Sequence, residues 1–149
     1  SKSRKKISNE EILKLTNLAE NYNTSELVDN CLAKNTKKTA TILNENNYSN
    51  EDCILIIRTF LNKTKRLLKL QEEVKNNISI DQAITNFKPP IFWKDKEIIR
   101  QQMTQWTLEK INKMIVNIIE IELLIKKNSS NSLNILSDFI ITQANKSNN

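Results

Sequence analysis

The sequence contains no glycine and no histidine among its 149 residues. A phosphate-binding P-loop and a dinucleotide-binding fingerprint both need glycine where the backbone approaches phosphate, so the sequence excludes both. Tight type I′ hairpin turns are disfavoured as well, because they use Asn-Gly or Asp-Gly. The absence of histidine removes the commonest general base, every Ser-His or Cys-His nucleophile pair and most zinc sites. We therefore predict that this chain is not an enzyme and holds neither a cofactor nor a metal.

Cysteines and aromatic residues are few. Cys31 and Cys53 both stand among apolar residues without metal-type spacing, so we predict two buried free thiols. Such usage is typical of the reducing cytoplasm, which is the predicted location. No signal peptide is present, and the most apolar stretch, residues 114–125, is too short for a membrane span and contains Glu120 and Glu122. We expect no membrane partner.

The formal net charge is +6, with lysine far more abundant than arginine. Lys, Asn and Ile all have AT-rich codons, so genome composition accounts for part of this bias and weakens the charge as an argument for nucleic-acid binding. The basic start formed by Lys2, Arg4, Lys5 and Lys6 is predicted to be a disordered terminus. The chain begins at Ser1 without a methionine, which predicts a fragment or a processed protein.

Apolar residues recur with the helical period along almost the whole chain. The expected helices cover about residues 8–20, 24–34, 36–46, 50–76, 79–87, 95–106, 107–127 and 131–144. Breaks are expected at residues 21–23 and again at Asn35-Thr36. The predicted fold class is all-α, a compact orthogonal bundle of about six to eight helices.

The run Phe87-Lys88-Pro89-Pro90-Ile91-Phe92-Trp93-Lys94 interrupts this helical pattern. Two consecutive prolines remove two backbone donors, fix two φ angles and push Lys88 out of the helical region. The pattern predicts a stiff, extended elbow that positions two helical blocks. Phe92, Trp93 and Trp106 could stack on single-stranded bases. Their positions at an elbow and a helix end instead favour a role as core staples, that is, buried aromatic residues that hold neighbouring helices together.

Two polar patterns are candidate interface or structural features. Arg58, Asn62, Lys65, Arg66 and Lys69 share one face of the helix at 50–76, which is either a phosphate-facing or subunit-facing stripe or a solvated face.

Glu120 and Glu122 are two residues apart and point about 200° apart on a helix, so they cannot form an acid/base pair. One of them is expected to be partly buried and paired with Lys or Arg, and Lys126 lies one turn beyond Glu122 in the favourable orientation.

An ordered set of motifs spans residues 54–127. It comprises Ile56-Ile57-Arg58, a short helix from Ile80 to Phe87, Pro89-Pro90-Ile91-Phe92-Trp93-Lys94, Gln105-Trp106-Thr107-Leu108 and Glu122-Leu123-Leu124-Ile125-Lys126. In order and spacing this set resembles the C-terminal region of the delta subunit of the bacterial DNA polymerase III clamp loader. The segment from Ile7 to Ile12 is similar to the end of that family's lid subdomain, and the segment from Thr24 to Asp29 to the entry of its C-terminal domain.

The resemblance implies a non-catalytic collar domain that supports loading of the sliding clamp during DNA replication. In that family the helical C-terminal domains of the subunits pack side by side into a ring-shaped collar, and the delta subunit lacks working ATPase residues. The implied partners are gamma/tau-type and delta-prime-type subunits, with primer-template DNA as a further contact of the full assembly. The sliding clamp would be contacted only through the family's N-terminal domain, which nothing in these residues matches.

The implied organisation is a lid-like end at 1–22, a collar-like domain at 23–145 and a disordered tail at 146–149. The candidate interface or structural residues are Arg58, Arg66, Pro89, Pro90, Phe92, Trp93, Trp106, Glu122 and Lys126. The alternative prediction is a free-standing basic helical domain that binds nucleic acid, resting on the basic charge and the 58–69 stripe.

Overall fold

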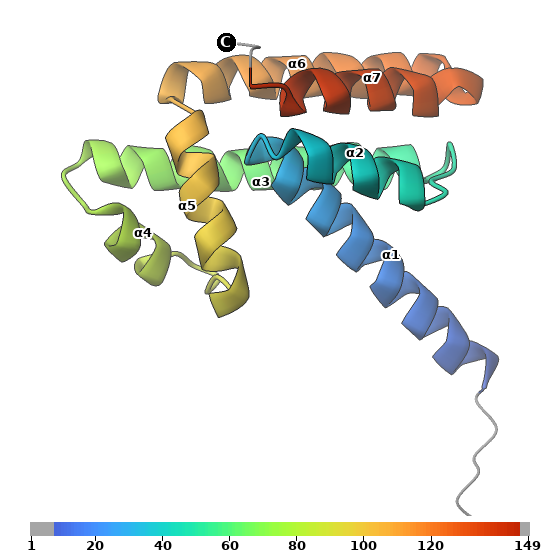
Figure 1. Ribbon diagram of the computed structural model, residues 1–149, viewed down its shortest axis with the longest axis horizontal. Helices are drawn as coiled ribbons and strands as arrows, with labels where there is room; N and C mark the ends of the chain where they lie inside the picture. The colour runs from blue at the N-terminus through green and yellow to red at the C-terminus, as the bar shows by residue number, and fades with distance from the viewer. Residues whose placement is uncertain (1–7, 147–149) are drawn as a thin grey trace, which may run out of the picture.

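The computed structural model describes residues 8–146, apart from the side chains of residues 16, 17 and 20, and is all-helical in this part (Figure 1). The helices are α1 (Asn9–Leu32), α2 (Thr36–Glu45), α3 (Asp52–Lys75), α4 (Ile80–Asn86), α5 (Lys96–Gln105), α6 (Leu108–Lys127) and α7 (Ser132–Ala144), with short 3-10 turns η1 (Trp93–Asp95) and η2 (Ser129–Asn131). This confirms the predicted all-α bundle. The basic residues at positions 2–6 and the tail residues 147–149 lie outside the described residues.

Side-chain caps fix several helix starts where the sequence predicts them. The Ser8 hydroxyl accepts from the Glu11 N–H, and the Glu11 carboxylate accepts from the Ser8 N–H, which makes a capping box at α1. The hydroxyls of Ser79 and Thr107 cap α4 and α6 by accepting from the N–H groups of Gln82 and Lys110.

Two non-glycine residues adopt left-handed backbone dihedral angles just after the end of a helix. These are Lys34 after α1, with φ of 58°, and Asn77 after α3, with φ of 66°. Glycine usually occupies this left-handed position after a helix, and in a chain without glycine other residues must occupy it.

One predicted helix boundary is wrong. The expected break at Asn21-Tyr22-Asn23 does not occur, and a single α1 runs from Asn9 to Leu32. Asn and Tyr are only moderately unfavourable in a helix, and no glycine or proline stands there to end it. The burial nevertheless changes at this point, because the described side chains between residues 8 and 22 are exposed and Thr24 is already buried. The division into a lid-like piece and a collar-like domain stays a prediction.

Helix α3 is the centre of the bundle and packs most extensively against α6. The two helices are antiparallel: Arg58 near the start of α3 pairs with Glu122 near the end of α6, whereas Gln71 near the end of α3 donates to the carbonyls just before α6. Helix α5 crosses α3 steeply, and α7 lies beside α6 (Figure 1). The second half of α1 packs against α2, α3, α5 and α7.

The core is aliphatic, as the shortage of aromatic residues predicts. Its fully buried members include Leu27, Leu32, Ile56, Ile57, Phe60, Leu67, Ile99, Ile111, Met114, Ile118, Leu136 and Ile140. Phe60 of α3 and Phe139 of α7 meet edge to face with ring centroids 5.5 Å apart. Among the helices of residues 8–146, none combines the length and hydrophobicity that a bilayer crossing requires.

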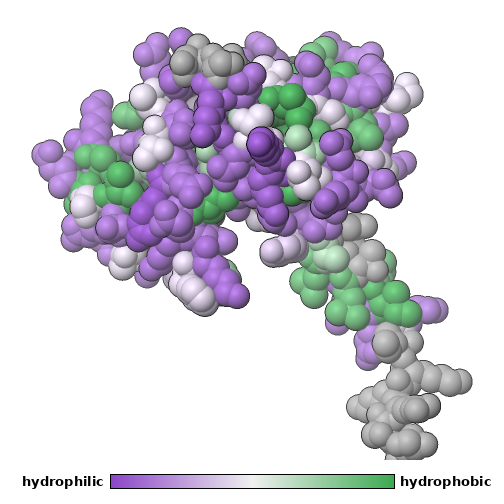
Figure 2. All heavy atoms as spheres, in the orientation of Figure 1, coloured by the Kyte–Doolittle hydropathy of each residue, from purple (hydrophilic) through white to green (hydrophobic). Residues whose placement is uncertain are grey.

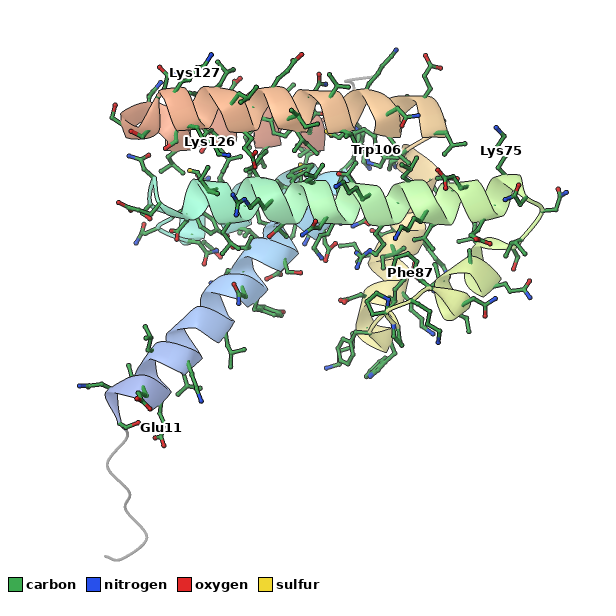
Figure 3. The ribbon with its side chains drawn as sticks, turned by 180° about the vertical axis from the view of Figure 1, so that it is seen from behind. Glu11, Lys75, Phe87, Trp106, Lys126 and Lys127 are labelled. Atoms are coloured by element: carbon green, nitrogen blue, oxygen red, sulfur yellow. The ribbon has the colours of Figure 1, made fainter. Side chains whose placement is uncertain are left out.

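The first half of α1 projects away from the bundle and carries hydrophobic side chains in the open. Figure 2 shows this run on the projecting helix, and its members are Ile12, Leu13, Leu15, Leu18 and Tyr22. Glu11 lies near the far end of the projection (Figure 3). Large apolar side chains grouped in this way on one element are typical of an interaction surface rather than of chance exposure.

Candidate functional site

The Pro-Pro elbow connects α4 to α5, and its aromatic residues face outward. Phe92 is 57% exposed and Trp93 is 68% exposed. Their rings pack on one another with centroids 5.9 Å apart, and Lys94 Nζ lies 5.4 Å from the Trp93 ring centroid. The prediction that Phe92 and Trp93 staple the core is therefore wrong. The half-buried residues at the two ends of the prolines, Phe87 and Ile91, pack against the core instead.

The elbow backbone is extended around Phe92, as predicted, and the Lys88–Pro89 peptide bond is cis. Pro89 and Pro90 are both exposed. The elbow therefore presents a proline-rich, apolar surface to solvent rather than filling an internal gap.

Trp106 does staple the core, as the sequence predicts. Its indole N–H donates to the Leu32 carbonyl over 2.6 Å, and the amine of Lys34 lies 4.7 Å from its ring centroid. Gln71 of α3 donates to the carbonyls of Met103 and Trp106, which fixes the junction between α5 and α6. Figure 3 shows Trp106 at this junction. The residue locks the end of α1 to the start of α6.

The predicted pairing of Glu122 with a basic residue is confirmed. Glu122 is partly buried and lies 3.8 Å from Arg58 Nε and 3.3 Å from Lys126 Nζ, whereas Glu120 is exposed. The pairs are largely exposed on the cationic side, so each contributes no more than roughly 1 kcal/mol. Only the Arg58 pair connects α3 to α6, because Lys126 lies on the same helix as Glu122.

The basic stripe of α3 is only partly brought together. Arg58 points toward α6, whereas Arg66 turns toward α1 and lies 3.5 Å from Asp29. Asn62, Lys65 and Lys69 remain exposed. The stripe is therefore neither a continuous phosphate-facing row nor a uniformly solvated face.

Asp29 is the hub of a buried polar network that the sequence analysis missed. Lys63 Nζ donates to its carboxylate over 2.9 Å, and the Gln102 amide donates to both its carboxylate and its carbonyl. Arg66 contacts Oδ1 of the same carboxylate, whereas Lys63 contacts Oδ2. One signal was available: Asp29 interrupts the apolar run Leu27-Val28 to Cys31-Leu32, and a carboxylate in a buried segment needs a cationic partner.

A cleft lies between the exposed side of α3 and the elbow; we call it the elbow cleft. Its volume is about 550 Å³. Its lining residues are Asn62, Lys65, Arg66, Lys69, Phe87, Pro89, Pro90, Ile91, Phe92 and Asp95. Phe87 lies beside the connection between α4 and α5 in Figure 3. The cleft thus brings four predicted site residues, Arg66, Pro89, Pro90 and Phe92, to one place, together with Lys65 and Lys69 of the stripe.

Helix α6 carries a second exposed hydrophobic group, which we call the α6 apolar face. It consists of Val116, Ile119, Leu123 and Leu124. The opposite side of α6 supplies Ile111, Met114, Ile118 and Ile125 to the core. A helix that is apolar nearly all round is usually buried in a core or an interface, and the bundle covers only one side of α6.

Two buried titratable groups belong to packing rather than to chemistry. Burial raises the pKa of the Cys31 thiol, which donates to the Ile140 carbonyl. Burial lowers the pKa of Lys34, whose amine donates to the carbonyl of Gln143 near the end of α7. Cys31 and Cys53 are both buried free thiols, as predicted.

No cluster of acidic or thiol side chains suitable for a metal ion occurs in the part of the chain that the structure describes. Comparison with known proteins adds no family: no family model matches the chain, and neither a curated protein nor a solved structure shows a significant similarity to it. The interpretation of function therefore depends on the surfaces themselves.

Proposed function

We propose that the chain is a non-catalytic interaction module that supports sliding-clamp loading, as the collar domain of a clamp-loader delta-type subunit does. The observation that carries the proposal is the exposed hydrophobic surface on two separate elements, the projecting half of α1 and the α6 apolar face. Two such surfaces suit a domain that packs between neighbours in a ring. The proposed partners are gamma/tau-type and delta-prime-type subunits in the cytoplasm.

The energetics of the α6 apolar face favour protein association. Its four side chains are each about half exposed. Full burial of an aliphatic side chain contributes roughly 1.5–3 kcal/mol, so covering the remaining half of four contributes roughly 3–6 kcal/mol. That gain is of the same order as the cost of associating two proteins, so the α6 apolar face would act together with a further contact such as α1.

Pull-down with the clamp-loader partner subunits tests the proposal. We expect the full chain to retain partner subunits, and the double variant Ile119→Glu/Leu123→Glu to lose most of the association. Asn117→Glu is the matched control, because Asn117 is exposed on the same helix but points away from Ile119 and Leu123. Equal retention by all three proteins, or none by the unchanged chain at any salt concentration, would contradict the proposal.

Nucleic-acid binding is a second candidate function, favoured by one observation. The exposed rings of Phe92 and Trp93 stand beside Lys94, and exposed aromatic residues near cations can stack on single-stranded bases. A salt titration of binding to single and double strands separates the two candidates. A steep negative salt slope together with a loss of affinity in Trp93→Ala would favour this function, whereas no binding at low salt would remove it.

A further inference from the structure

We propose that the elbow cleft is a docking site for an acidic peptide segment of a partner protein, one that alternates carboxylates with apolar side chains. This goes beyond the collar function, because neither α1 nor the α6 apolar face takes part in it. The proposal rests on the two unlike walls of the elbow cleft, on uncompensated positive charge at its base and on unused backbone donors in the elbow.

The two walls differ in chemistry. The α3 wall presents Lys65, Arg66 and Lys69, and the elbow wall presents Pro89, Pro90 and Ile91, flanked by Phe87 and Phe92. Asp95 is the single carboxylate among the described lining residues. A volume of about 550 Å³ lies within the range of about 300–1,000 Å³ that is usual for ligand sites. The walls therefore suit a ligand with acid on one side and hydrocarbon on the other.

Arg66 brings excess positive charge to the base of the elbow cleft. The Asp29 carboxylate already has Lys63 at 2.9 Å and the Gln102 amide at 3.1 Å, whereas Arg66 lies farther away at 3.5 Å. The buried Nε of Arg66 has no acceptor among the described residues. One carboxylate thus faces two cations, and an additional acidic ligand would compensate the second.

The elbow backbone favours a peptide over a nucleic acid. Among the described residues, the N–H groups of Ile91 and Phe92 donate to no acceptor within the chain. These groups can donate to the carbonyls of an extended peptide. Of the aromatic rings, Phe87 and Phe92 line the elbow cleft and the more exposed Trp93 does not. Phe87 packs partly buried against the core, so the described lining offers one exposed ring, Phe92, for base stacking.

Fluorescence anisotropy with the full chain tests the proposal. The probes are fluorescein-labelled octapeptides that alternate Asp with Leu, Lys with Leu, or Asp with Ser, together with a single-stranded dT10. We expect the Asp-Leu peptide to bind, the Lys-Leu peptide not to bind, and the Asp-Ser peptide to bind more weakly because it leaves the elbow wall uncovered. Lys65→Glu/Lys69→Glu should weaken Asp-Leu binding by about tenfold or more, since two exposed ion pairs are replaced by repulsions.

Lys37→Glu is the matched control, an exposed lysine on α2, which lies away from the α4–α5 connection (Figure 1). It should change the affinity by less than about twofold. Amide chemical shifts of the unmodified chain provide a readout that needs no variant, and the Asp-Leu peptide should move the signals of residues 65–69 and 87–92. Shifts confined to other residues, unchanged affinity in the Lys65/Lys69 variant, or displacement of the peptide by an equal concentration of dT10 would overturn the proposal.

Discussion

Removing the Asp29 carboxylate should destabilise the bundle strongly. The side chains of Asp29, Lys63 and Arg66 are only 8%, 12% and 18% exposed to solvent. Asp29→Ala leaves both cations and the Gln102 amide without their common acceptor. Deleting one partner of a buried pair costs about 3–5 kcal/mol, and the residual exposure of the two cations allows partial escape to water. We expect the free energy of unfolding to fall by about 3 kcal/mol, at the lower end of that range.

Urea denaturation followed by circular dichroism at 222 nm measures this loss. Glu26→Ala is the matched control on the same helix, because Glu26 pairs with the more exposed Lys38, and its loss should stay below about 1 kcal/mol. Replacing the pair by apolar residues, as in Asp29→Leu/Lys63→Met, should recover part of the stability, since no charge is then left uncompensated on Lys63. A loss below about 1 kcal/mol for Asp29→Ala would refute the reasoning, because it would mean that solvent already satisfies the network.

Three further predictions concern the packing of the bundle. Trp106→Phe removes the donor to the Leu32 carbonyl, and urea denaturation should show a loss of about 1–3 kcal/mol; an unchanged midpoint would contradict the staple. Thr107→Ala removes the cap of α6 and should cost about 1 kcal/mol in the same assay, which Thr107→Ser should largely restore. Burial raises the pKa of Tyr48 to about 12 and raises that of Cys31 as well, so the folded state holds protons that the unfolded chain releases. The free energy of unfolding should therefore fall as the pH rises above 9.0, although the lowered pKa of Lys34 has the opposite effect on stability. Tyr48→Phe should make this fall less steep above pH 10.0. A free energy of unfolding that rises over this pH range would contradict the assignment.

Local patterns in the chain predicted most helices because capping and periodicity are local properties. Ser79 and Thr107 cap the helices whose expected ranges begin at these two positions. The residues Cys53, Ile57, Phe60 and Leu67 follow the helical period and are all buried. The failure at residues 21–23 has the same origin. Several mildly unfavourable residues looked like a break, but the packing of residues 24–32 in the bundle outweighs their weak preference.

The candidate site was less predictable because it depends on contacts between distant segments. Phe92 and Trp93 are large aromatic residues of the kind usually found in a core. They are exposed because of how the elbow is oriented relative to α3. Likewise, Arg58 and Arg66 share one helix face, yet one pairs with α6 and the other with α1.

The amino-acid sequence by itself determined that the chain forms helices, that its core is aliphatic, and that it lacks the residues for a P-loop, for histidine-based catalysis and for most zinc sites. These properties follow from residue type and spacing, which act over one or two helical turns. The tertiary structure alone decided which apolar residues stay uncovered, that Asp29 joins three helices, and that the elbow and α3 enclose a cleft. Such features are set by how whole helices cross and pack, and that arrangement is fixed by the sum of many distant contacts rather than by any single stretch of sequence.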